Sequence, residues 1–382
     1  MVAPVIPSMG FSDFISGLVR EHQGRAPLFG SIETTFRCNL NCIHCYVNVP
    51  AHDPDARARE VPLSRLLGLI DEIAEQGCLE LLLTGGEVLI HSSFAETYQH
   101  AARKGLRVTV FTNGTLVTDE VVRIFKDTPP RGVEITLYGM TRETYECITR
   151  VKGSFERCLQ GIHRLYRAGI PLKLKTMIMK WNVHELTAMR EFSQNLGLPF
   201  RHDGLLNPRI DEHFFPVDKL QLGAEQLAAI DLEVSTFRKH LQDGAGKLSN
   251  GCPSVVTSGC NQAYTCGAGM VAFNIDPYGR LQLCQLARKY SFDLKNNSFR
   301  NGWDDFLPGI RYRQLSQPSA CRHCTLASCC AGCSGASELE CGDPGKPVAR
   351  FCRITHARMY RLLGEIPGHR PDASCCLKTA GG

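Results

Sequence analysis

The strongest constraint on the fold is an alternation of short apolar runs with longer amphipathic segments, between Ser31 and about Gly204. In residues 63–76, for example, apolar side chains recur three and four positions apart, which is typical of a helix with one buried face. Six strands that alternate with helices predict an α/β fold with a parallel sheet and right-handed crossovers. The predicted strands are residues 32–36, 79–84, 107–111, 132–138, 172–179 and 200–204. The predicted helices are residues 63–76, 93–104, 119–127, 154–168 and 183–195.

Three cysteines follow the first predicted strand with the spacing CxxxCxxC: Cys38, Cys42 and Cys45. A cubane iron–sulfur cluster normally takes four thiolates, so three local cysteines leave one iron open to an external ligand. The alternatives are a structural zinc knuckle or half of a disulfide framework. Both are disfavoured, because no second zinc half-site of the C-x2-C or H-x3-H form lies nearby. Active-site residues of parallel α/β folds gather at the carboxyl ends of the strands, where this triplet falls.

Composition limits the other possibilities. The chain has 382 residues, 43% of them hydrophobic, which is enough for two domains without disulfide support. Its net charge is +5 and it has no long basic run, so we expect no nucleic-acid partner. No apolar stretch approaches the roughly 20 residues that span a bilayer, and residues 1–10 do not form a secretory signal. We therefore expect a cytoplasmic protein without a membrane partner, whose 19 cysteines mainly bind metal or clusters.

The triplet is followed by Tyr46, and the second predicted strand ends in Thr84-Gly85-Gly86-Glu87. Together these motifs resemble the radical S-adenosylmethionine superfamily. The resemblance implies a partial (β/α)6 TIM-type barrel and a [4Fe-4S] cluster on Cys38, Cys42 and Cys45. That cluster would cleave S-adenosylmethionine reductively to a 5′-deoxyadenosyl radical. It also implies that Gly85 and Gly86 bind the methionine amino group, that Glu87 anchors their conformation and that Tyr46 packs near the adenine.

Two further cofactor-binding residues are expected from the same resemblance. In the fourth predicted strand, Glu134, Thr136 and Tyr138 share the face that is turned to the barrel interior. Thr136 matches a position where relatives use Ser or Thr toward the ribose. Arg150 is expected to pair with the methionine carboxylate, and the alternative is an exposed arginine at a helix end. Asn113 is interpreted as a turn residue in Thr-Asn-Gly.

The later cysteines resemble the SPASM extension, which binds two auxiliary [4Fe-4S] clusters in peptide-modifying radical enzymes. By this resemblance the chain holds three clusters in all. The first auxiliary cluster would take Cys260, Cys266, Cys284 and Cys333. The second would take Cys321, Cys324, Cys330 and Cys352. The family commonly has three residues between the last two cysteines of this tight group, whereas two residues separate Cys330 from Cys333. Cys329 would restore the spacing of three, but we favour Cys330 as the ligand. Zinc bound by Cys321, Cys324, Cys330 and Cys333 is the alternative.

The remaining cysteines have no assigned ligand role. We interpret Cys78, Cys147 and Cys158 as buried small hydrophobes. Cys252, Cys341, Cys375 and Cys376 stay without an assignment.

The predicted domains follow from the change in cysteine density. They are an N-terminal arm (1–28), the radical SAM partial barrel (29–205), a bridging segment (206–250) with a helix at 224–240, a small cysteine-rich iron–sulfur domain of SPASM type (251–366) and a disordered tail (367–382). In the fourth of these, two strand-like pieces, 270–275 and 280–283, are joined by the turn signal Asp-Pro-Tyr-Gly.

The resemblance implies an oxidoreductase that abstracts hydrogen from a ribosomally made peptide or protein side chain, giving a thioether or carbon–carbon crosslink or another oxidative modification. An external donor of the flavodoxin or ferredoxin type would supply electrons. The residues before the first strand are too few for a winged-helix precursor-binding domain, so a separate leader-binding protein is one expected partner. Asp203, which ends the sixth strand, is a candidate substrate-side group or a solvated loop residue.

Three alternatives remain. One is a radical enzyme that acts on a small molecule, such as a tetrapyrrole decarboxylase. Another is a formylglycine-forming sulfatase maturase, which is disfavoured because Gln285 stands where that family has Asp. The last is a non-catalytic iron–sulfur electron carrier.

Overall fold

The computed structural model describes residues 17, 24–211, 217–246, 261–317, 319–322, 324–330, 332–366, 368–370 and 373. The predictions made for Cys252, Cys260, Cys375 and Cys376 lie outside the described residues, as do most of the predicted arm and tail.

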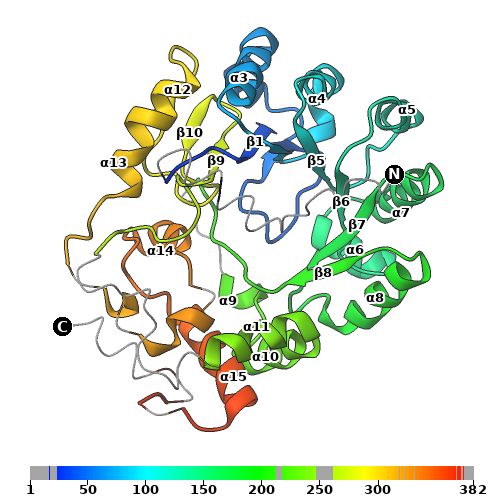
Figure 1. Ribbon diagram of the computed structural model, residues 1–382. Coiled ribbons are helices and arrows are strands. Elements are labelled where there is room, and N and C mark those ends of the chain that lie inside the picture. Colours follow the sequence, from blue (N-terminus) through cyan, green and yellow to red (C-terminus); the bar gives the residue numbers. More distant parts are fainter. Residues whose placement is uncertain are drawn as a thin grey trace, which may run out of the picture.

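Six parallel strands form the arc of a partial barrel, which confirms the predicted fold class (Figure 1). In spatial order they are β1 (Phe29–Thr35), β4 (Glu80–Gly85), β5 (Arg107–Thr112), β6 (Gly132–Thr136), β7 (Leu172–Met177) and β8 (Phe200–Asp203). All six lie where the sequence predicts strands, with small shifts at the ends.

Helices cover the outer face of this arc (Figure 1). The predicted ones are found as α3 (Leu63–Glu75), α4 (Phe94–Arg103), α5 (Asp119–Asp127), α7 (Ser154–Arg167) and α8 (Leu186–Asn195), the last preceded by the 3₁₀ turn η2 (Val183–Glu185). Three further elements were not predicted: α2 (Pro54–Arg59), α6 (Arg142–Thr149) and the 3₁₀ turn η1 (Val88–Ile90).

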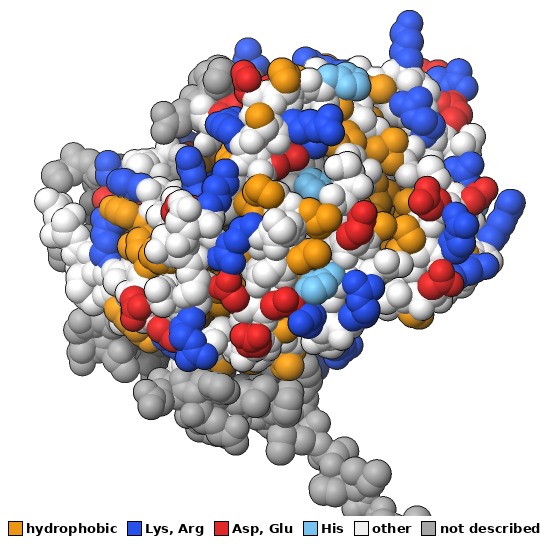
Figure 2. All heavy atoms as spheres, turned by 90° about the horizontal axis from the view of Figure 1, so that it is seen from above, with side chains coloured by type: hydrophobic (Ala, Val, Ile, Leu, Met, Phe, Trp, Pro, Cys, Tyr) orange, Lys and Arg blue, Asp and Glu red, His pale blue; other side chains and the backbone are white. Residues whose placement is uncertain are grey.

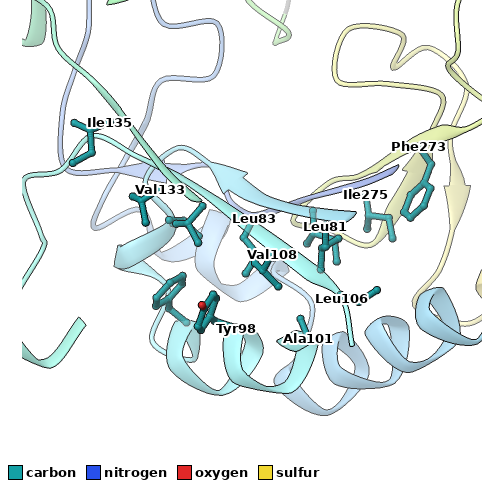
Figure 3. Close-up of a cluster of buried hydrophobic side chains, with 14 of the residues drawn as sticks. Leu81, Leu83, Tyr98, Ala101, Leu106, Val108, Val133, Ile135, Phe273 and Ile275 are labelled. Carbon is teal, nitrogen blue, oxygen red and sulfur yellow. The ribbon is translucent and has the colours of Figure 1, made fainter. Parts of the chain in front are cut away.

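The main core lies between the sheet and this helical layer. Leu81, Leu83 and Val108 point from the strands toward Tyr98 and Ala101 of α4 (Figure 3). The residues that alternate with them, such as Glu134 on β6, face the barrel interior. The strands therefore place apolar side chains outward, into the core, and place polar and charged side chains such as Glu134 in the barrel interior.

The C-terminal part of the chain extends the same sheet. β9 (Ala272–Ile275) pairs in parallel with β1, and β10 (Arg280–Gln282) and β11 (Phe292–Asp293) follow as antiparallel strands. The two predicted strand-like pieces are thus confirmed as a hairpin. Their pairing with β1 was not anticipated, and it produces one nine-stranded sheet. The division of the chain into domains stays a prediction.

Helices of the bridging segment pack against the C-terminal part (Figure 1). The predicted helix at 224–240 is two helices, α10 (Ala224–Glu233) and α11 (Ser235–Gly246), because Val234 takes an extended conformation. Asp231 of α10 forms a buried ion pair with Arg358 of α15 (Ala349–Leu363). The other elements are α9 (Val217–Leu220), α12 (Phe299–Asn301), the π-helical turn η3 (Gly302–Phe306), α13 (Leu307–Arg311), η4 (Ala320–Arg322), η5 (Thr325–Cys329), α14 (Ser334–Cys341) and the small sheet of β2 (Arg37–Cys38) and β3 (Val49–Pro50).

The surface mixes both signs of charge. On the face seen in Figure 2, Lys and Arg side chains are interspersed with Asp and Glu. Within the described ranges, none of the helices combines the length and the apolar character needed to cross a membrane.

Candidate active site

The cysteine triplet lies in a loop at the carboxyl edge of the parallel sheet. Cys38 ends β2 just after β1, and Cys42 and Cys45 follow in irregular backbone. The loop is held by the C-terminal end of α6, because the amides of Asn41 and Ile43 donate to the carbonyls of Thr149 and Ile148, both at 2.9 Å. The last carbonyls of a helix have no partner inside the helix. Here the cysteine loop supplies that partner, so α6 fixes the loop.

The three thiols lie within electrostatic reach of one another. Burial raises the pKa of Cys38 to about 12, and the Glu87 carboxylate adds to the effect. The pKa of Cys42 is also raised, first by burial and then by Cys45 and Cys38. Each outer sulfur accepts a backbone hydrogen bond, Cys38 from Leu40 at 3.4 Å and Cys45 from Asn48 at 3.3 Å. Free thiols would stay protonated here, so the thiolate form requires a bound positive charge, and an iron cluster supplies one.

Gly85 and Gly86 are required by the close approach of two backbones. A Cβ on Gly85 would lie 2.1 Å from the Thr35 carbonyl oxygen, and a Cβ on Gly86 would lie 2.4 Å from the carbonyl oxygens of Phe36 and Arg37. The Gly86 amide donates to the Thr35 carbonyl at 2.7 Å. The space beside these glycines is therefore filled by the end of β1, which binds the Gly-Gly turn directly to the strand that leads to Cys38.

Glu87 connects three strand ends. It is fully buried, and its carboxylate accepts from the Thr112 hydroxyl and the Asn113 amide, both at 2.7 Å, and from the Leu89 amide at 3.0 Å. Asn113 in turn donates through its side chain to Asn39 at 2.9 Å and toward the Cys38 sulfur at 3.8 Å. Burial raises the pKa of Glu87, while these three donors act in the opposite direction. These hydrogen bonds hold Glu87 in one orientation, and its expected role beside the Gly-Gly turn stays a prediction.

Two residues at this edge were not predicted to take part in the site. Asn113 was interpreted as a turn residue, although its position directly after β5 places it at the carboxyl edge of the sheet. Tyr138 was assigned only to the interior face. The structure places the Tyr138 ring 4.9 Å from that of His44, inside the cysteine loop. Burial lowers the pKa of His44 to about 4, so its ring is neutral and acts as packing inside the loop.

The other expected cofactor residues lie at different depths. Thr136 is half-buried on the inner face of β6, and Tyr46 is half-buried next to Glu33 and Arg288. Arg150 is exposed and caps α6 in the left-handed conformation, with φ at +57°. It directly follows Thr149, whose carbonyl binds the cysteine loop. Its position is that of an exposed arginine at a helix end. Its pairing with the methionine carboxylate of S-adenosylmethionine stays a prediction.

Among the later cysteines, Cys284 has the most perturbed environment of the first predicted set. Its pKa is raised to about 11, first by burial and then by the charges of Cys333 and Cys266. That these cysteines bind one cluster stays a prediction. The Ala287 amide donates to the Cys284 sulfur at 3.4 Å. The fourth member, Cys260, lies outside the described residues.

The adjacent cysteines 329 and 330 point in different directions. Cys330 accepts from the Thr355 hydroxyl at 3.4 Å, so it faces the part of α15 that carries Cys352. Cys329 is 5% exposed and packs in an apolar cluster with Leu241 and Met359. This arrangement favours Cys330 as a ligand. In the part of the chain that the structure describes, no three His, Cys, Asp or Glu side chains gather around one ion-sized position.

The three scattered cysteines are not alike. Cys78 and Cys158 are buried, as expected. The expectation for Cys147 is wrong, because Cys147 lies on α6 and is exposed. No helix was predicted for residues 142–149, and the orientation of α6 turns Cys147 to solvent.

Asp203 stabilises the loop that follows β8. Its carboxylate accepts from the Leu205 amide at 2.8 Å, which is typical of a loop-capping aspartate.

A buried polar network joins the Cys284 loop to β1. Arg288 donates to both carboxylate oxygens of Glu33, at 2.6 and 2.8 Å, and Asn274 of β9 donates to the same carboxylate at 3.0 Å. Gln285, next to Cys284, donates to the Ser31 hydroxyl at 3.1 Å. The auxiliary cysteine loop is therefore held against the strand that leads into the Cys38 loop.

Residues 32–193, which contain the triplet, the Gly-Gly-Glu turn and five of the six barrel strands, match the radical SAM superfamily. They form a radical SAM domain. The radical SAM assignment brings with it a [4Fe-4S] cluster and S-adenosylmethionine as cofactors. The three cysteines are half-buried and two of them accept backbone hydrogen bonds, which suits such a cluster.

Relatives extend beyond the radical SAM domain. The AdoMet-dependent heme synthase of Methanosarcina barkeri is 28% identical over 335 residues, covering 83% of this chain and 94% of the relative. The mycofactocin maturase MftC of Mycolicibacterium smegmatis is 28% identical over 330 residues, covering 84% and 81%. The crystal structure of Streptococcus suis SuiB bound to S-adenosylmethionine has a TM-score of 0.63 at 15% identity, covering 90% of this chain and 83% of SuiB. That likeness shows a shared fold over most of the chain.

Proposed function

We propose that this chain is a radical SAM maturase that modifies a ribosomally made peptide or protein. The observation that carries the proposal is the geometric link between two cysteine sites: the triplet at the barrel edge and the Cys284 loop that Glu33 and Arg288 hold against β1. An electron carrier has no need of a three-cysteine loop beside a Gly-Gly-Glu turn.

The residues present fit the cofactors. Cys38, Cys42 and Cys45 would hold the [4Fe-4S] cluster, and Gly85, Gly86, Glu87, Tyr46, Thr136 and Arg150 would form the S-adenosylmethionine site. When bound, the two cofactors supply a 5′-deoxyadenosyl radical, which abstracts a hydrogen atom from the substrate. Amide donors from Leu40 and Asn48 stabilise negative charge on the sulfurs, and the cap formed by α6 keeps the loop in place.

Two auxiliary [4Fe-4S] clusters complete the proposal. The electrostatic influence of Cys333 and Cys266 on Cys284 supports the first, with Cys260 as its fourth ligand. The orientation of Cys330 toward α15 supports the second, with Cys321, Cys324 and Cys352. Both would carry electrons between the substrate and an external donor of the flavodoxin or ferredoxin type.

A peptide substrate is supported by the names of several relatives. Besides the mycofactocin maturase, they include the antilisterial bacteriocin subtilosin biosynthesis protein AlbA of Bacillus subtilis, 26% identical over 326 residues, and SuiB has been solved bound to its precursor peptide SuiA. Leader recognition would then fall to this chain or to a separate binding protein. Formylglycine formation is disfavoured, because the amide of Gln285 is engaged with Ser31.

A tetrapyrrole substrate is the second candidate. It is favoured by the match to the M. barkeri heme synthase, which covers 94% of that relative.

The cofactor test is anaerobic reconstitution followed by assay with dithionite and S-adenosylmethionine. We expect about twelve irons per chain and formation of 5′-deoxyadenosine. Cys42→Ala should abolish 5′-deoxyadenosine, whereas Cys284→Ala should lose about four irons and keep reductive cleavage. Cys147→Ala, at an exposed cysteine, is the control and should change neither quantity. A chain with full iron content that forms no 5′-deoxyadenosine would contradict the proposal.

A further inference from the structure

Four charged side chains meet on the inner face of strands β6, β7 and β8. The Glu134 carboxylate lies 3.6 Å from the Lys173 ammonium, 3.6 Å from the Lys175 ammonium and 2.8 Å from the Arg201 guanidinium. On β7 the neighbouring residues Leu172 and Leu174 point outward into the core, so the two lysines point inward. This group, here called the inner cationic cluster, is not part of the cysteine loop or of the Gly-Gly-Glu turn.

The inner cationic cluster has more positive than negative charge. Three cations share one carboxylate, whose oxygen Oε2 faces Arg201 and Lys175 and whose Oε1 faces Lys173. No second carboxylate forms an ion pair with these cations among the residues that the structure describes. Burial alone would raise the pKa of Glu134, yet the Arg201 hydrogen bond and the nearby lysines lower it. Glu134 is therefore charged, and the cluster has a formal excess of two positive charges when Lys173, Lys175 and Arg201 are all protonated.

Lys175 is the most buried of the three cations. Its ammonium lies 3.0 Å from the centre of the Phe111 ring, and its side chain is only 15% exposed. Burial lowers the pKa of Lys175 to about 7, against the opposing effect of Glu134. A second anion beside this buried ammonium would stabilise its charged form.

The cluster lies beside the proposed cofactor site and can be reached from solvent. Lys175 is the register partner of Thr136 in the β6–β7 pair, and Thr136 is the residue proposed to face the ribose. Arg201 is the register partner of Lys175 on β8, and its side chain is 42% exposed. A ligand held by these cations would therefore lie one strand away from Thr136.

We propose that the inner cationic cluster binds a carboxylate of the substrate and orients the substrate toward Thr136. This inference rests on the proposed function and deepens it, because it names an acidic substrate. Arg201 and Lys175 would each donate a charge-assisted hydrogen bond to the carboxylate, while Glu134 holds both cations in place. The carboxylate has two possible sources, an acidic side chain or C-terminus of a peptide and a propionate of a tetrapyrrole.

The test is equilibrium binding to the reconstituted enzyme, without reductant, so that no turnover occurs. One probe is a Glu-containing tetrapeptide with an uncharged fluorophore, compared with its Gln counterpart. The other is coproporphyrin III, compared with its tetramethyl ester. We expect an acidic probe from one of these pairs to bind more tightly than its neutral partner.

Substitutions in the cluster give the sign of the effect. Lys175→Met and Arg201→Met should each weaken binding of the acidic probe about tenfold and leave the neutral probe unchanged. Glu134→Gln should instead tighten it, because the competing carboxylate is gone. Lys175→Arg, which keeps the charge, should bind within a few-fold of the unaltered enzyme. Lys104→Met, at an exposed lysine paired with Asp71, is the control and should have no effect.

Equal affinity for the acidic and the neutral probe of both pairs would overturn the inference. So would a loss of affinity in Glu134→Gln equal to that in Lys175→Met, if the circular dichroism spectra of both variants are unchanged. The peptide arm and the tetrapyrrole arm both support it, and they distinguish the two sources. Failure of the proposed function is seen separately, as absence of 5′-deoxyadenosine from the unaltered enzyme.

Discussion

Gly85 shows how a single residue can be required by the fold before any ligand binds. Its φ is +140°, and its missing Cβ leaves room for the Thr35 carbonyl. From the sequence we expected these glycines to allow the close approach of a cofactor. The structure shows that they also allow the close approach of the backbone at the end of β1. The motif could be recognised from its letters, but the close approach could not, because it joins residues that are far apart in the chain.

Gly85→Ala should therefore destabilise the fold severely. Backbone strain contributes about 1–3 kcal/mol and the overlap with Thr35 a further 1–3 kcal/mol or so. The measurement is urea unfolding of the reduced apoprotein. Gly77→Ala is the matched control, because Gly77 also has a positive φ, +88°, but nothing lies within 4 Å of its Cβ position. Equal losses in the two variants would show that the contact with Thr35 is not the cause.

At the scale of elements, the strands and helices whose own apolar pattern stabilises them could be predicted from the sequence. The six barrel strands alternate between the core and the interior, and the five predicted helices have continuous apolar faces, so each could be located from the sequence. Helix α6 was missed because its stability comes from elsewhere: the Glu185 carboxylate accepts from the Met140 amide at 2.5 Å and the Thr141 amide at 3.1 Å at its N-terminal end. Its C-terminal end is completed by the cysteine loop.

Glu185→Ala should weaken α6 and, through it, the hold on the iron cluster. Removing a capping group costs about 0.5–2 kcal/mol. We expect faster loss of iron to a chelator such as bathophenanthroline, with the cluster absorbance decaying at an increased rate. Glu143→Ala is the control, since Glu143 lies in the first turn of α6 and is exposed. An unchanged rate in Glu185→Ala would contradict the role assigned to α6.

At the scale of the whole molecule, one sheet and the buried Glu33–Arg288 ion pair join the barrel to the C-terminal part. Cysteine spacing predicted two functional blocks, yet it held no information on how they meet, because the β1–β9 pairing and the Glu33–Arg288 contact join residues more than 200 positions apart. The interior position of Glu33 would have been a usable sign, since a carboxylate in a buried strand requires a partner.

Arg288→Met should leave Glu33 buried without its cation and cost about 3–5 kcal/mol of unfolding free energy. The double variant Glu33→Gln/Arg288→Met should recover most of that loss, because no charge is then stranded. Anaerobic urea unfolding of the single and double variants measures the difference. Arg142→Met, in an exposed ion pair with Glu156, should leave the unfolding midpoint unchanged. A double variant as unstable as Arg288→Met would show that the pair does not act as a unit.

The pairing of β1 with β9 also sets an order of events during synthesis. The ribosome releases β1 first, and its free edge has no partner until residues 272–275 have been made. A nascent chain that stops at the barrel therefore presents an open strand edge, which is a template for aggregation. Translation of residues 272–275 is thus the step that protects the free edge of the first strand.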